Sequence, residues 1–141
     1  MYAEVQAFLT RKAALLNAAD FRSFVADFDF PMALYVEGNL VLFVNPDAMV
    51  GGMTRFRAML AQDGMHHMVP RLRAVEIPRL GRFRIWANWD HFDAEGRVVS
   101  QSDYVYHCRA RGGHITSEMV QVTRVASQRL LPPLPVQAFR G

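Results

Sequence analysis

Apolar positions near the amino terminus recur with a helical period. Between Ala3 and Asn17 the large apolar residues fall on one stripe of the repeat, which predicts an amphipathic helix: Val5, Phe8, Leu9, Leu15 and Leu16. Asp20 follows a short break and can accept hydrogen bonds from the free amides of the next turn. A second, shorter helix is therefore predicted from Asp20 to about Asp29.

The pattern then changes to a hairpin followed by a third helix. Gly38-Asn39 suits a two-residue turn between extended runs at 32–37 and 40–44. Asn45 and Pro46 are typical of a helix cap and first turn, and an apolar stripe continues to Gly64. Gly51-Gly52 costs about 1 kcal/mol per glycine relative to alanine, which predicts an irregular start or a close approach to a neighbouring backbone.

Long extended segments fill most of the second half of the chain. They cover about 67–77, 82–92, 98–109 and 114–125, and the short connections between them favour an antiparallel meander. Residues 1–125 are expected to form a single domain. The remaining residues, 126–141, contain Pro132, Pro133 and Pro135 and are expected to form an extended arm that docks through leucines and Phe139.

Alternation along the meander sorts its side chains into two faces. A four-residue loop at Asp93–Gly96 pairs Phe92 with Arg97. It groups on one face Phe83, Ile85, Ala87, Trp89, His91, Ser100, Ser102, Tyr104, Tyr106, Cys108, Ile115, Ser117, Met119, Gln121 and Thr123. The opposite face is more charged, and it carries Trp86, Val105, Val120 and Val122 among Arg84, Asp103 and Glu118.

The apolar face is the better partner for the helices, so we expect it to point inward. Helices cannot cover a long curved sheet completely, and a cavity is expected between the first helix, the first hairpin and this face. Its predicted lining residues are Tyr35, Trp89, His91, Ser102, Tyr104, Tyr106, Met119 and Gln121. The charged face suits a polar subunit interface, which predicts a homodimer through the sheet.

Composition supports a folded domain. The chain has 141 residues, of which 51% are hydrophobic and 21% charged, enough for one sizeable core. No apolar run approaches the roughly 20 residues needed to cross a bilayer, so we expect no membrane partner. Cys108 is the one cysteine and is interpreted as a core residue. A cytoplasmic location is expected.

Charge and metal-ligand patterns point to no particular chemistry. The formal net charge is +3, and all the basic residues except Lys12 are arginines. Several of them flank one predicted hairpin, where solvated strand edges explain them better than a nucleic-acid face does. The histidines are scattered or point to opposite faces, so neither a metal nor a cofactor is expected.

The order of elements resembles the nuclear transport factor 2-like superfamily, in its SnoaL-like and ketosteroid-isomerase-like branch. Local patterns that carry the resemblance are Leu16–Phe21 at the end of the first helix, Gly96–Ser100, and Gly113–Thr116. The resemblance implies an α+β, cone-shaped fold, in which N-terminal helices pack on a curved, mostly antiparallel sheet. It also implies a cavity for small, often hydrophobic molecules, and frequent dimerisation.

Catalytic residues of the steroid isomerases do not carry over to this sequence. The position of their oxyanion tyrosine falls near Lys12, and that of their general base falls near Glu37, beside a turn. Asp90-His91-Phe92 repeats the tripeptide that contains their second acid, but it lies one strand too early. The resemblance therefore leaves the isomerase mechanism unsupported.

Three classes of function stay open at this point. The leading one is a small-molecule-binding domain without an assigned reaction. The second is a cofactor-independent isomerase, dehydratase or hydrolase acting through His91, Tyr104, Tyr106 or Tyr35. The third is a non-catalytic interaction module, for which the cone would be filled by side chains. A polar acid–base pair converging inside the cavity would favour the second class.

Overall fold

The computed structural model describes residues 1–128 and 136–139. The helical elements are α1 (Tyr2–Asn17), α2 (Phe21–Phe24), the short 3₁₀ helix η1 (Val25–Asp27) and α3 (Pro46–Gln62). The strands are β1 (Phe28–Val36), β2 (Asn39–Phe43), β3 (His67–Val75), β4 (Arg82–Phe92), β5 (Val98–Arg111), β6 (His114–Arg124) and β7 (Val136–Phe139).

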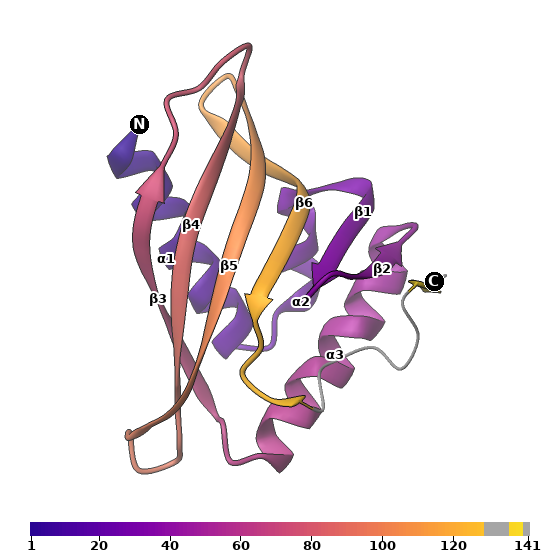
Figure 1. The fold of residues 1–141 in the computed structure, drawn as a ribbon, viewed down its shortest axis with the longest axis vertical. Helices are drawn as coiled ribbons and strands as arrows, with labels where there is room; N and C mark the ends of the chain where they lie inside the picture. Colours follow the sequence, from indigo (N-terminus) through magenta and orange to yellow (C-terminus); the bar gives the residue numbers. More distant parts are fainter. Residues whose placement is uncertain (129–135, 140–141) are drawn as a thin grey trace.

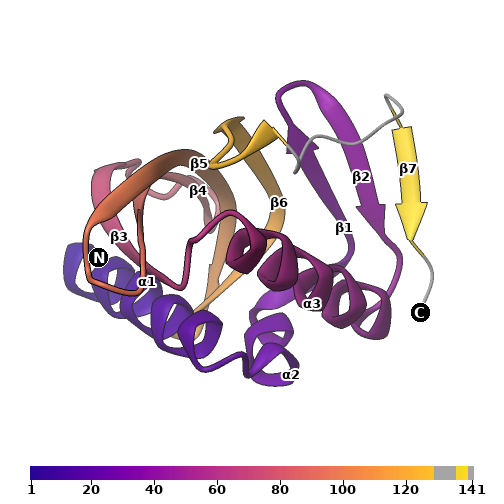
Figure 2. The same cartoon turned by 90° about the horizontal axis from the view of Figure 1, so that it is seen from below.

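One curved sheet and a layer of helices make up the molecule (Figure 1). The strands follow the order β3-β4-β5-β6-β1-β2-β7. Neighbours pair antiparallel except for β1 with β6 and β2 with β7, which are parallel. The helices close the concave side of the sheet, and the other side carries none (Figure 2). The predicted α+β architecture, with helices on a curved, mostly antiparallel sheet, is confirmed.

Side-chain caps start two of the helices where the sequence predicts. Asp20 Oδ1 accepts a hydrogen bond from Ser23 N at 3.2 Å, and Asn45 Oδ1 accepts one from Ala48 N at 2.9 Å. Each bond satisfies an amide of the first turn that has no partner within the helix. The predicted second helix is divided between α2 and η1.

The first hairpin turns one residue earlier than predicted. Val36 pairs with Asn39, so Glu37 and Gly38 form the turn, with φ of 48° and 87°. Two positive φ values define the type of turn that follows the twist of a hairpin. Asn39 therefore belongs to β2.

The long strands show which side chains face the helices. Phe92 pairs with Val98 rather than Arg97, and most of β4 is shifted by two residues against β5 from the predicted pairing. An even shift keeps every side chain on its face. The predicted inward residues of β4 are accordingly buried: Phe83, Ile85, Ala87, Trp89 and His91.

The prediction for β6 is wrong beyond Ser117. Cys108 pairs with Ser117 but the preceding His107 pairs with Met119, so Glu118 is an additional residue in β6. This bulge reverses the alternation that follows. Val120 and Val122 are buried in the core, and Met119 and Gln121 lie on the outer face beside His107.

The carboxyl end contributes one strand to the sheet. Within residues 126–141, for which an extended arm is predicted, residues 136–139 form β7, which pairs with β2. Leu130, Leu131 and Leu134 lie outside the described residues, and the side chain of Phe139 is not described. Within residues 1–128 and 136–139, no helix is long and apolar enough to cross a membrane.

Candidate functional site

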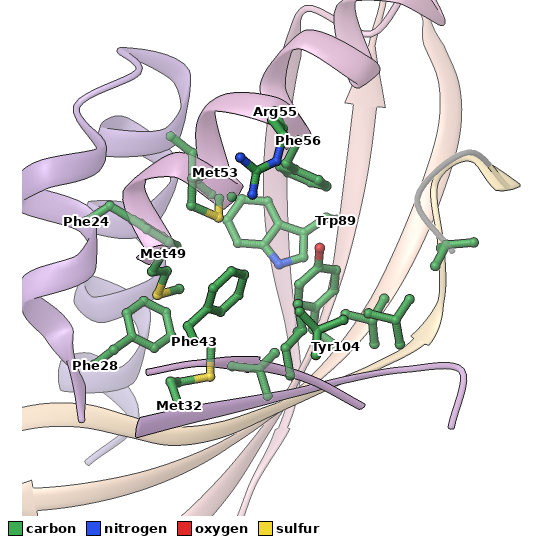
Figure 3. Close-up of a pocket in the computed structure, with 18 of the residues that line it drawn as sticks. Phe24, Phe28, Met32, Phe43, Met49, Met53, Arg55, Phe56, Trp89 and Tyr104 are labelled. Atoms are coloured by element: carbon green, nitrogen blue, oxygen red, sulfur yellow. The ribbon is translucent and has the colours of Figure 1, made fainter. Parts of the chain in front are cut away.

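A cavity of about 320 Å³ lies between α3 and the inner face of the sheet (Figure 3). This volume is at the lower end of the range of roughly 300–1,000 Å³ that is usual for ligand pockets. It is lined by Leu16, Phe24, Phe28, Met32, Leu34, Val36, Val41, Phe43, Met49, Gly52, Met53, Arg55, Phe56, Met59, Met68, Trp89, Tyr104, Tyr106, Val120, Val122, Val125 and Ala126.

The alternation of side chains along β1 and the helical period of α3 direct side chains from both elements into the cavity. Alternate residues of β1 face the cavity, at Met32, Leu34 and Val36. The apolar stripe of α3 faces it from the other side, through Met49, Met53, Phe56 and Met59. Sheet and helix therefore each contribute one apolar surface, and the cavity is the space that their side chains leave unfilled.

Gly52 allows α3 to pass close to β2. A Cβ atom at this position would lie 2.6 Å from Cε1 of the Phe43 ring, closer than real side chains approach. The helix is continuous through Gly51-Gly52, so the close approach that the two glycines predict occurs against a side chain, and no irregular start is seen. Phe43 is thereby held in the cavity wall.

Few polar groups reach this cavity. Tyr106 OH accepts a hydrogen bond from Trp89 Nε1 at 2.9 Å. The Tyr104 hydroxyl points into the cavity in Figure 3 and has no hydrogen-bond partner within the described residues. The exposed side chain of Arg55 stands at the cavity edge. Tyr104 is thus the free polar group within the apolar wall.

Burial keeps the phenols and the thiol of this region neutral. It raises the pKa of Tyr104 to about 12 and that of Tyr106 well above the usual value. Burial also raises the pKa of Cys108, which does not line the cavity, to about 11. At neutral pH Tyr104 can donate or accept a hydrogen bond, but it cannot act as an anionic base.

His91 is buried outside the cavity. Its Nε2 lies 2.9 Å from Ser102 Oγ, and its Nδ1 has no hydrogen-bond partner in the described part of the chain. Burial lowers the pKa of His91 to about 4, so the ring is neutral at physiological pH. Neither His91 nor Ser102 is among the lining residues.

Lys12 lies directly behind the aromatic wall. Its Nζ is 4.0 Å from the ring centroid of Phe28 and 4.8 Å from that of Phe24, and both rings also line the cavity. The side chain is 1% exposed, and Nζ has no hydrogen-bond partner among the described residues. Burial lowers the pKa of this amine to about 8, while nearby Cys108 and Asp27 partly oppose the shift.

The predicted lining residues separate into three groups. Trp89, Tyr104 and Tyr106 line the cavity, whereas His91 and Ser102 are buried beside it. Tyr35, Met119 and Gln121 do not line it. Tyr35 alternates with Leu34 and Val36, and it pairs with Gln121 on the outer face. For Met119 and Gln121 the cause is the bulge at Glu118.

Sequence reasoning missed the contribution of α3, and from the first hairpin it named Tyr35 instead of the alternating residues Leu34 and Val36. The apolar stripe containing Met49, Met53 and Phe56 was visible, but such a stripe is usually explained by packing against the core. The valines of β6 were assigned to the wrong face.

Other candidate chemistry is distributed over the surface. Arginines of the β3–β4 hairpin pair with acidic or amide groups: Arg71 with Asp90 at 3.0 Å, Arg73 with Asn88 at 2.6 Å and Arg84 with Glu76 at 2.8 Å. Glu37 is an exposed turn residue. Within the described ranges, no group of three or more His, Cys, Asp or Glu side chains could hold a metal ion.

Solved structures with this architecture come from several bacteria. Aln2 from a Streptomyces species has a TM-score of 0.64 and 19% identity, over 87% of this chain and 89% of that one. The β subunit of benzoate 1,2-dioxygenase from Burkholderia mallei has a TM-score of 0.66 and 13% identity, over 94% and 95%. ActVI-ORFA from Streptomyces coelicolor has a TM-score of 0.65 and 12% identity, over 93% and 97%. The likeness to these proteins is one of fold.

Comparison with curated protein sequences finds no significant match. The family model described as NTF2-like protein (DUF6841) matches residues 3–122, which include every element from the first helix to most of β6. The cavity, the curved sheet and the covering helices all lie largely within this match. The chain belongs to this NTF2-like family.

Proposed function

We propose that the protein binds a small hydrophobic molecule that carries one hydrogen-bonding group, such as a carbonyl or hydroxyl oxygen. The observation that carries the proposal is the unpaired Tyr104 hydroxyl in an otherwise apolar cavity of about 320 Å³. A polar group in an apolar pocket fixes the orientation of a ligand, and the surrounding hydrophobic surface supplies most of the affinity. The NTF2-like family commonly binds small molecules or acts on them.

The cavity favours binding over the two alternatives. The described lining residues include no carboxylate, imidazole or thiol, so no acid–base pair converges there. His91 has its ring in the core, and Tyr35 lies on the outer face. The interaction module without a cavity is disfavoured because side chains do not fill the cone.

A thermal-shift panel tests the proposal. We expect a bicyclic ketone at millimolar concentration to raise the melting temperature, because a ligand that binds only the folded state stabilises it. The hydrocarbon of the same skeleton should bind more weakly. Tyr104→Phe should reduce the affinity for the ketone about three- to tenfold, the usual effect of one hydrogen bond, and leave that for the hydrocarbon unchanged.

Tyr35→Phe is the matched control, because it removes the same atom from the outer face of the sheet. Its affinity for both compounds should equal that of the wild type. A melting temperature that no member of a wider panel of hydrophobic metabolites changes at millimolar concentration would refute the binding function. An equal loss in both tyrosine variants would refute the role of Tyr104.

Dimerisation through the outer face of the sheet belongs to the same proposal. This face carries no helix, and it places Trp86, Val105 and Met119 on the neighbouring strands β4, β5 and β6. Val105 is buried without belonging to the main core. Paired arginines and carboxylates surround these residues, among them Arg84, Glu118 and Asp103. A surface of mixed charge can complement itself about a two-fold axis. NTF2-like proteins often form dimers.

A further inference from the structure

Two hairpin ends meet at one end of the longest axis of the molecule (Figure 1). They are the β3–β4 connection, residues 76–81, and the β5–β6 turn, residues 112–113. Ala110 N donates a hydrogen bond to Gly81 O at 2.8 Å, and Arg82 pairs with Arg109 across β4 and β5. We call this surface, residues 77–82 and 109–114, the arginine tip.

Two large aliphatic side chains project from the tip into solvent. Ile77 is 88% exposed and Leu80 is 100% exposed. Leu80 also has a φ of 53°, in the left-handed region that asparagine and glycine adopt far more readily than a leucine. Neither burial nor backbone preference within the protein accounts for a leucine at this position. Exposed apolar side chains that share one loop are typical of contact sites for a partner outside the chain.

The same surface concentrates the positive charge of the chain. Arg82 and Arg109 share the carboxylate of Glu118, with Nε–Oε1 distances of 3.0 and 3.3 Å. Arg79 and Arg111 form no ion pair within the described residues. The tip therefore carries four arginines, two of which share one carboxylate, while Glu76 in the same connection is paired with Arg84. The local surplus of +3 equals the formal net charge of the whole chain.

We propose that the arginine tip binds an anionic lipid surface. Ile77 and Leu80 enter the layer between the headgroups, and the four arginines contact lipid phosphates around them. Leu80 lies in the turn that Arg79 and Arg82 close by two backbone hydrogen bonds, so an aliphatic side chain at the apex has arginines at its base. This order matches the apolar and anionic layers of a membrane. The contact is peripheral and needs no membrane-spanning segment.

The shape of the tip favours a lipid over a protein partner. A specific protein interface buries about 1,200–2,000 Å² of total surface, with complementary shapes. A narrow hairpin end with two aliphatic side chains offers far less area (Figure 1). A lipid layer adapts to a small convex surface and requires no such complementarity. The proposal is independent of the ligand cavity, from which Ile77 and Leu80 are absent.

Co-sedimentation with vesicles tests the proposal on the full chain. We expect binding to vesicles of phosphatidylcholine with phosphatidylglycerol, and at least tenfold weaker binding to phosphatidylcholine alone. Raising the salt concentration should weaken binding, because each arginine near an anionic surface contributes about a fivefold factor that salt screens. Arg79→Gln with Arg111→Gln should lower both the affinity and its salt dependence.

The variant Leu80→Asn tests the insertion of Leu80 into the lipid layer without disturbing the fold. Asparagine tolerates the positive φ of Leu80, so this variant should fold at least as well as the wild type. We expect it to bind anionic vesicles at least tenfold more weakly. Val98→Ser with Val99→Ser is the matched control, since these side chains are 51% and 49% exposed at the other end of the sheet. There, Arg97 is already paired with Asp93 at 3.0 Å.

The control variant should bind vesicles as the wild type does. The proposal is overturned if wild-type protein does not bind anionic vesicles, or if Leu80→Asn binds them equally well. It is also overturned if Leu80→Asn abolishes self-association while vesicle binding is absent, a result that would assign the tip to a protein contact. The ketone affinity of Leu80→Asn should equal that of the wild type, so a failure here leaves the cavity proposal standing.

Discussion

Lys12 is the residue whose environment departs furthest from what its chemistry prefers. It lies on the apolar stripe of α1, between Leu9 and Leu16, and like them is buried. Rings of Phe8, Phe24, Phe28 and Tyr106 surround its ammonium, with centroids 4.0–5.6 Å away. Cation–π attraction offsets part of the lost hydration, yet the lowered pKa shows that burial dominates.

The sign of this shift gives a prediction. The pKa of Lys12 is about 8 in the folded protein and 10.5 for an unperturbed lysine. Between these two pH values the unfolded chain holds a proton that the folded chain has released. Protonation therefore favours unfolding by up to about 3 kcal/mol below pH 8, and the penalty disappears as the pH rises to 10.5. Lys12→Met, similar in length but uncharged, should raise the free energy of unfolding at pH 7 by about 1–3 kcal/mol.

Urea denaturation of wild type and variant from pH 7 to pH 10.5 measures the effect. The difference between the two proteins should shrink with rising pH, and the effects of titrating groups that do not interact with Lys12 cancel in it. Lys12 is the only lysine, so no other ammonium side chain titrates in this window. A variant less stable than the wild type at pH 7 would show that the ammonium stabilises the core through its aromatic contacts.

At the level of elements, features that depend on neighbouring residues were easier to predict from the sequence than the pairing of strands. Caps at Asp20 and Asn45 and the stripe of α1 follow from neighbouring residues, and all were predicted correctly. The bulge at Glu118 leaves no local mark, because it follows from how β6 fits both β5 and β1. All β6 residues whose predicted face is wrong follow Glu118. This is why the sequence pattern predicts Met119 and Gln121 on the inner face of the sheet, whereas they lie on the outer face.

The two glycines of α3 give a matched pair of substitutions. At Gly51 a Cβ atom would meet only Arg55 Nη1, at an ordinary 3.7 Å, so Gly51→Ala should stabilise the helix by about 0.4–1 kcal/mol. At Gly52 the Cβ would lie 2.6 Å from Cε1 of Phe43, so the ring must move. Gly52→Ala should therefore destabilise the protein by about 1–3 kcal/mol, the usual cost of overpacking.

Thermal unfolding of the two variants checks the pair. The melting temperature should rise for Gly51→Ala and fall for Gly52→Ala, by a few degrees in each case. Gly52→Ala should also lower the affinity for the ketone, because Phe43 is forced toward the cavity. Equal melting temperatures for the two variants would mean that Phe43 moves aside at no cost.

At the scale of the whole molecule, the order of elements predicted the architecture but not the cavity wall. Helices on one face of a curved sheet follow from the apolar stripes and the short turns. The size of the cavity depends on how side chains from different elements meet, as where Gly52 admits Phe43. Such contacts join residues that are distant in sequence. The alternation along the strands therefore identified Trp89 and Tyr104 as lining residues, but no local pattern identified the α3 residues that face them across the cavity.

The outer face of the sheet gives the last prediction, which concerns assembly. A stable dimer needs about 1,200–2,000 Å² of buried surface, and a bare sheet face of long strands can supply it. In a two-fold interface each substitution occurs twice, so Met119→Glu places two carboxylates in the contact and should yield monomers. Sedimentation velocity should give twice the chain mass for the wild type and for Val99→Glu, a control at the far end of β5. A monomeric mass for the wild type that stays constant with concentration at physiological salt would exclude the dimer.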